Sequence, residues 1–85
     1  MLLGDKMHIN KNDNKYIYVI IGKNLKRIRQ EKGLTQVQLA DLIQYSEGTI
    51  ANIENNSFQT FSIEFIYIVS KKLNVPIIEF FKGID

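Results

Sequence analysis

The side chains that could carry catalytic or metal chemistry are few and scattered along the sequence. The chain has one histidine, His8, and no cysteine, which excludes a thiol nucleophile and a cysteine-based zinc site. Asp41, Glu47, Glu54 and Glu64 are spread over several predicted helices, without the spacing of metal ligands. The chain also contains no glycine-rich phosphate loop. The sequence therefore predicts no enzyme, no metal site and no cofactor.

One pair of charged residues has the pattern of a structural contact. Glu54 follows Ile50 by four residues, so both lie on the same inward face of a predicted helix. A carboxylate in that position requires a partner, because burying an unpaired charge is unfavourable. Arg29 borders the inward face of the first predicted helix and can provide a bidentate guanidinium. We therefore expect a buried ion pair between Arg29 and Glu54.

The elements that position these residues are read from helical periodicity. The first helix begins at a cap provided by Asp13 or Asn14 and is stopped by Gly33 after Lys32. Its inward face is formed by Ile17, Ile21, Leu25 and Ile28. Its opposite face carries a basic stripe of Lys23, Lys26 and Arg27.

Two short helices joined by a tight turn follow. Thr35 and Gln38 form a capping box that starts the second helix. The turn is Gln44-Tyr45-Ser46. Ser46 caps the third helix, which extends to Asn55. The inward residues of the two helices are Leu39, Ala40, Ile43, Ile50 and Ile53.

Two more helices are predicted near the C-terminus. Ser62 caps the fourth, Asn74 ends it in the left-handed conformation, and Pro76 begins a short fifth helix through Phe81. The apolar stripe of the fourth helix consists of Ile63, Ile66, Val69 and Leu73.

The fold class is therefore all-α with five helices, and the second and third form a helix-turn-helix. Residues 1–14 are predicted to be a polar tail and residues 15–85 a single domain. The lack of cysteine and of an apolar run near ~20 residues favours a cytoplasmic protein without a membrane segment.

A larger set of residues forms a specific pattern over residues 17–82. It consists of Ile21-Gly22, Leu25, Ile28-Arg29, Lys32-Gly33-Leu34-Thr35-Gln36, Leu39-Ala40, Ser46, Thr49-Ile50, Ile53-Glu54-Asn55, Ser62-Ile63-Glu64, Leu73-Asn74-Val75 and Phe80-Phe81. This pattern resembles the Cro/phage-repressor (XRE-type, lambda-repressor-like) helix-turn-helix domain. Chain size and the N-terminal extension also resemble the small controller proteins of restriction–modification systems.

The resemblance implies a set of contacts with double-stranded DNA. Gln36 matches a glutamine that hydrogen-bonds a phosphate at a helix N-terminus, where backbone N–H groups already favour an anion. The base-reading positions match Glu47, Gly48 and Asn52, with Thr49 beside them. Asn52 can read adenine through two hydrogen bonds, and Glu47 can accept one from the cytosine amino group. Arg29 and Glu54 match a buried ion pair in relatives.

The chain departs from the family pattern in its turn and in its charges. Gln44 and Tyr45 replace the common Gly-Val of the turn, so Gln44 is expected in the left-handed conformation at a cost of ~1 kcal/mol or more. Glu47 and Gly48 stand where relatives often carry Arg, Lys or Gln, and residues 33–70 contain no Lys or Arg. Phosphate attraction must then come from other groups. The expected ones are the side chains of Lys23, Lys26 and Arg27 and the backbone N–H groups near Asn56 and Ser57.

A surplus of apolar residues near the C-terminus predicts a homodimer. The interface is expected at Ile77, Phe80, Phe81 and Ile84, because so small a domain cannot bury them all. The resulting hypothesis is a homodimeric repressor or autoregulator on a two-fold symmetric operator, and the sequence gives no sign of a small-molecule effector. The alternative is a protein–protein interaction module on the same fold, such as an antitoxin-like or regulator-binding protein, with weak or no DNA binding.

Overall fold

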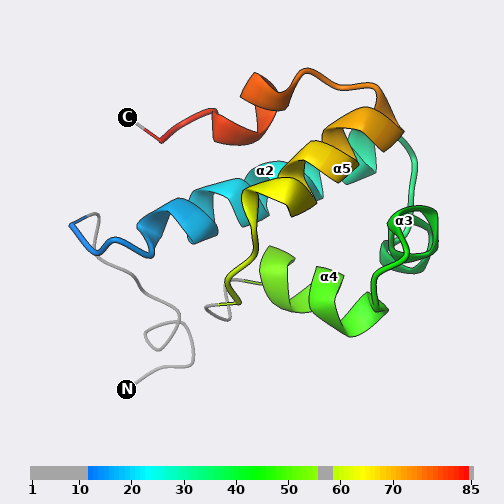
Figure 1. Ribbon diagram of the computed structural model, residues 1–85, viewed down its shortest axis with the longest axis horizontal. Helices are drawn as coiled ribbons and strands as arrows, with labels where there is room; N and C mark the ends of the chain where they lie inside the picture. The colour runs from blue at the N-terminus through cyan, green and yellow to red at the C-terminus, as the bar shows by residue number, and fades with distance from the viewer. Residues whose placement is uncertain (1–11, 56–58, 85) are drawn as a thin grey trace.

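The computed structural model describes residues 12–55 and 59–84, which form four α-helices and one 3₁₀-helix (Figure 1). In chain order these elements are α2 (Tyr16–Glu31), α3 (Gln36–Ile43), α4 (Glu47–Glu54), α5 (Ile63–Leu73) and the 3₁₀-helix η1 (Ile77–Phe81). The helical class is confirmed over these residues, and the short fifth helix predicted through Phe81 is the 3₁₀-helix η1, so the described chain has four α-helices rather than five. No helix within the described ranges is long and apolar enough to cross a membrane.

The helix ends follow the local chemistry of the sequence. The Thr35 hydroxyl accepts from the Gln38 N–H at 3.0 Å, and the Gln38 side chain accepts from the Thr35 N–H at 2.9 Å. Ser62 caps α5, Gly33 has a φ of 73° after α2, and Asn74 has a φ of 55° after α5. The expected cap of the first helix is wrong. Lys15 occupies the N-cap of α2, and the Asp13 carboxylate accepts from the Lys15 N–H at 2.8 Å.

The long helix α2 organises the core, with α4 on one side and η1 on the other (Figure 1). The most deeply buried side chains come from every element: Leu25, Leu39, Ile50, Phe65, Val69 and Phe80. Two residues expected on inward faces are exposed instead, Ile17 at 38% and Ile63 at 67%. Both lie in the first turn of their helix, where no element of the described chain covers them.

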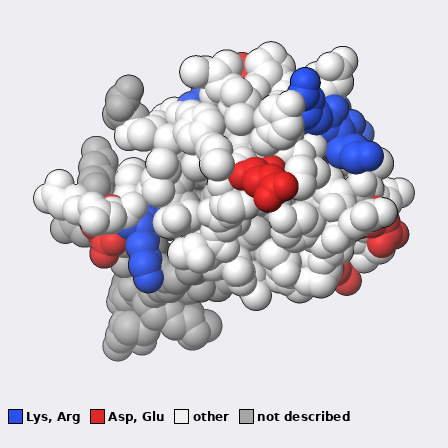
Figure 2. All heavy atoms as spheres, in the orientation of Figure 1, with Lys and Arg blue, Asp and Glu red and all other residues white. Residues whose placement is uncertain are grey.

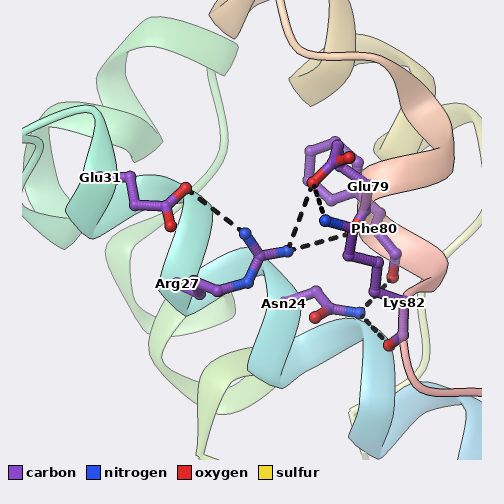
Figure 3. Close-up of polar contacts among 6 residues, drawn as sticks. All are labelled: Asn24, Arg27, Glu31, Glu79, Phe80 and Lys82. Carbon is purple, nitrogen blue, oxygen red and sulfur yellow. Dashed lines mark hydrogen bonds and ion pairs between the residues drawn. The ribbon is translucent and has the colours of Figure 1, made fainter.

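Two side chains of α2 hold η1 through its backbone (Figure 3). The buried Asn24 amide donates to the carbonyl oxygens of Phe80 and Lys82, each at 2.8 Å. The Arg27 guanidinium donates to the Glu79 carbonyl oxygen at 3.2 Å. These tertiary bonds satisfy carbonyls at the C-terminal end of the segment, which have no partner within so short a helix. A segment of five residues could form few i→i−4 bonds, which explains the 3₁₀ form.

Candidate DNA-binding surface

The turn between α3 and α4 fixes the angle between the two helices. Gln44 has a φ of 62° and a ψ of 44°, the left-handed conformation expected from the sequence. The Tyr45 N–H then donates to the Ala40 carbonyl oxygen at 2.9 Å, and the Tyr45 ring packs edge-on against Phe65. Ser46 follows directly as the N-cap of α4 and accepts from the Thr49 N–H at 3.1 Å. Three residues thus redirect the chain from α3 into α4.

The outward face of α4 carries the residues that the resemblance assigns to base contact. Glu47, Gly48 and Asn52 are exposed, whereas Ile50, Ile53 and Glu54 on the other face are buried. Thr49 is half-buried, and its hydroxyl shares a hydrogen bond of 2.8 Å with the hydroxyl of Ser46. The structure therefore brings Glu47, Gly48 and Asn52 onto one solvent-facing surface and directs the Thr49 hydroxyl toward the helix cap.

A buried polar network links this helix pair to α2. Arg29 Nε lies 2.7 Å from Glu54 Oε2, and Arg29 Nη2 lies 2.8 Å from Glu54 Oε1. The remaining guanidinium nitrogen donates to the Leu34 carbonyl oxygen at 2.7 Å. The hydrogen bonds that Arg29 donates to Glu54 raise the pKa of Arg29 above its ordinary value, although burial alone would lower it. The guanidinium is therefore charged at every working pH and joins α2, α4 and the start of α3.

Gln36 belongs to the same network, which the sequence did not reveal. Its Nε2 donates to Glu54 Oε1 at 3.1 Å, so one of the two amide hydrogens of Gln36 is used in this buried contact. The second amide hydrogen remains available in the first turn of α3, where backbone N–H groups precede the first internal helical bond. This places a side-chain donor beside backbone donors at one helix N-terminus, the arrangement that suits a phosphate.

Gly22 lets α2 and α4 approach each other closely. A Cβ at this position would overlap the Ile53 carbonyl oxygen and would lie 3.2 Å from the carbonyl carbon. A glycine inside a helix is intrinsically unfavourable, so it indicates close backbone approach. The sequence pattern contained this residue without revealing its role.

The basic stripe of α2 does not act as one surface. Lys23 and Lys26 are exposed, and Lys26 follows Gly22 by one helical turn, so it lies on the side of α2 that contacts α4. Arg27 points to the other side and pairs with Glu31 at 3.4 Å and Glu79 at 3.9 Å (Figure 3). The phosphate contact expected for Arg27 remains a prediction, and in this structure its guanidinium is engaged by the two carboxylates. Asn56 and Ser57 lie outside the described residues.

The residues expected at a dimer interface differ in how far they are exposed to solvent. Phe80 is 0% exposed and belongs to the core of the domain, which excludes it from an intersubunit surface. Phe81 and Ile84 are half-buried against the same core, and Ile77 is exposed. The apolar side chains that stand out into solvent are different ones, chiefly Ile63, Tyr67 and Ile78.

Comparison with known proteins places this arrangement in a family. The family model described as helix-turn-helix matches residues 25–80, which include α3, α4, α5 and most of η1. The chain is also similar to the antitoxin PezA of Streptococcus pneumoniae, with 33% identity over 60 residues. The matched region makes up 71% of this chain and 37% of that relative, so the chain spans well under half the relative's length. The chain belongs to the helix-turn-helix family, whose fold indicates a DNA-binding regulator.

Proposed function

We propose that the protein is a sequence-specific transcriptional regulator that binds a two-fold symmetric operator as a homodimer, most simply as a repressor or autoregulator. One observation carries this proposal. Glu47, Gly48 and Asn52 form an exposed surface on a helix whose other face is fixed to the core by Glu54. Rigid placement of exposed polar side chains is what base readout requires.

The proposed docking follows from the two helix N-termini. In a helix-turn-helix, the second helix of the pair enters the major groove and the first crosses the phosphate backbone. Here α4 would present Asn52 to an adenine and Glu47 to a cytosine amino group. The start of α3 would meet a phosphate through Gln36 and its backbone N–H groups.

The direct test is binding to DNA from the region upstream of the protein's own gene. We expect a saturable gel shift or anisotropy change at a stated salt concentration, stronger than for a shuffled duplex of equal length and composition. Equal binding to both duplexes at low salt would refute sequence-specific recognition.

Glu47→Gln separates base readout from a carboxylate that is merely tolerated. If Glu47 accepts from a cytosine amino group, the substitution will cost about 1–3 kcal/mol of specific affinity and change the preferred base at one position per half-site. The measurement is competitive binding to operators that vary at each position. Glu31→Gln is the charge-matched control, because Glu31 pairs with Arg27 on the η1 side of α2. A uniform gain in affinity for all sequences would show that Glu47 only repels phosphates.

Lys23 and Lys26 are expected to provide salt-sensitive affinity. Each neutralised phosphate contributes about −0.9 to the slope of log affinity against log salt. The double variant Lys23→Ala/Lys26→Ala should weaken binding to all sequences alike and flatten the slope by up to ~2. Lys82→Ala is the control and should leave the slope unchanged, because Lys82 directly follows η1, which packs on the side of α2 away from α4. An unchanged slope in the double variant would place these lysines away from DNA.

A second candidate function is a protein–protein interaction module. The similarity to an antitoxin favours it, as does the lack of Lys and Arg between residues 33 and 70. This candidate predicts that the protein binds no duplex in a randomised pool better than the average at low salt. Enrichment of one symmetric sequence from that pool would exclude it as the main function.

A further inference from the structure

The outward face of α5 carries large apolar side chains between two opposite charges. Ile63 is 67% exposed and Tyr67 is 54% exposed, whereas Phe65, Ile66 and Val69 on the other face are buried. Tyr67 and Lys71 follow at intervals of four residues, and Lys71 Nζ lies 5.4 Å from the centre of the Tyr67 ring. These side chains therefore run along one surface of the helix, with the exposed Glu64 beside them.

The apolar part of this face continues beyond α5. Ile63 lines an open groove of about 170 Å³ whose other apolar walls come from Ile17, Tyr18, Phe61 and Phe81. Large apolar side chains that cluster on a surface are typical of an interaction site. On an ordinary protein surface, exposed apolar side chains occur singly and scattered.

The charges on α5 indicate which partner covers this face, because opposite charges lie at similar distances on either side of Tyr67. Glu64 and Lys71 are seven residues apart, about 10 Å along the helix, and Tyr67 lies near their midpoint. On the face shown in Figure 2, an acidic group lies over the N-terminal half of α5 and basic groups lie over its C-terminal end, with uncharged surface between them. A helix with this pattern is complementary to an antiparallel copy of itself.

We propose that a second copy of this chain covers this face, with the two α5 helices packed antiparallel around Tyr67. A two-fold axis through the midpoint would set Glu64 of each protomer opposite Lys71 of the partner subunit, so two ion pairs would flank the apolar centre. Helices packed at about 8–10 Å bring such side chains within reach of each other. The inference deepens the proposed function, since it rests on the homodimer and specifies its interface.

The test uses charge reversal in the full chain. In Glu64→Lys or Lys71→Glu alone, like charges would face each other at both ends of the interface, and the dimer should dissociate at a concentration about tenfold higher or more. An equimolar mixture of the two variants should restore the parent's dimer, because both pairs in the mixed dimer are complementary. The readout is sedimentation velocity over a range of micromolar concentrations.

Two controls make the result specific. Lys72→Glu makes the same charge change one residue away, where the helical period turns the side chain about 100° from Lys71, and it should leave dimerisation unchanged. The melting temperature of each variant shows whether the protomer is folded. A parent that is monomeric at these concentrations, or variants that fail to restore each other when mixed, would overturn the proposal. A monomeric parent that still selects one DNA sequence would overturn the interface alone and leave DNA recognition standing.

Discussion

Glu54→Gln is expected to lower the stability of the domain by about 3 kcal/mol or more. The substitution removes the charge that pairs with the buried Arg29, and it replaces an acceptor with an amide donor that faces the guanidinium. For a domain of this size, such a loss corresponds to a fall in melting temperature of roughly 12 °C or more. Thermal and urea unfolding followed by circular dichroism measure the effect.

Two controls tell whether the buried pair is the cause. Glu31→Gln removes one partner of an exposed pair with Arg27 and should change stability by less than about 1 kcal/mol. The double variant Arg29→Met/Glu54→Met removes both charges and should recover part of the stability lost in either single variant. A Glu54→Gln protein that melts like the parent would contradict a buried, paired Glu54.

Gly22→Ala is expected to destabilise the domain by about 2 kcal/mol or more, against the usual direction. Alanine in place of a helical glycine normally stabilises by about 1 kcal/mol. At position 22 the new Cβ would overlap the Ile53 carbonyl oxygen, so α2 and α4 would have to separate across the core. Equilibrium unfolding measures both the sign and the size of the change.

Gly48→Ala provides the matched comparison within the same pair of helices. The nearest atom to a Cβ at position 48 is Ser46 Oγ at 4.0 Å, which is ordinary contact. This substitution should therefore stabilise the domain by about 0.5–1 kcal/mol. If Gly22→Ala also stabilised the protein, the close approach of the two helices would be disproved.

The sequence predicted features that depend on local chemistry. Thr35, Ser46, Ser62 and Asn74 each act on backbone groups a few residues away, so residue type and spacing were sufficient to place the helix ends. The contact between Arg29 and Glu54 was also predictable, because a carboxylate on an apolar helix face requires a cation and Arg29 borders the inward face of the first predicted helix.

Other features depend on where distant elements meet. Helical periodicity assigned Ile17 and Ile63 to inward faces, but it does not tell how far a neighbouring helix extends over a first turn. Phe80 resembled its exposed neighbours in sequence, and only the packing of η1 against α2 distinguishes it. The bond from Gln36 to Glu54 joins side chains 18 residues apart, and no local signal marks it.

The attachment of η1 affects which residues of this segment can be substituted during evolution. Asn24 and Arg27 bind the chain there mainly through carbonyl oxygens, which every amino acid supplies. The side chains at positions 79 and 82 can therefore drift without loosening that attachment, whereas Asn24 and the buried Phe80 cannot. Mutational tolerance should thus be high at positions 79 and 82, which are held through their carbonyl oxygens, and low at position 80, whose side chain fills the core.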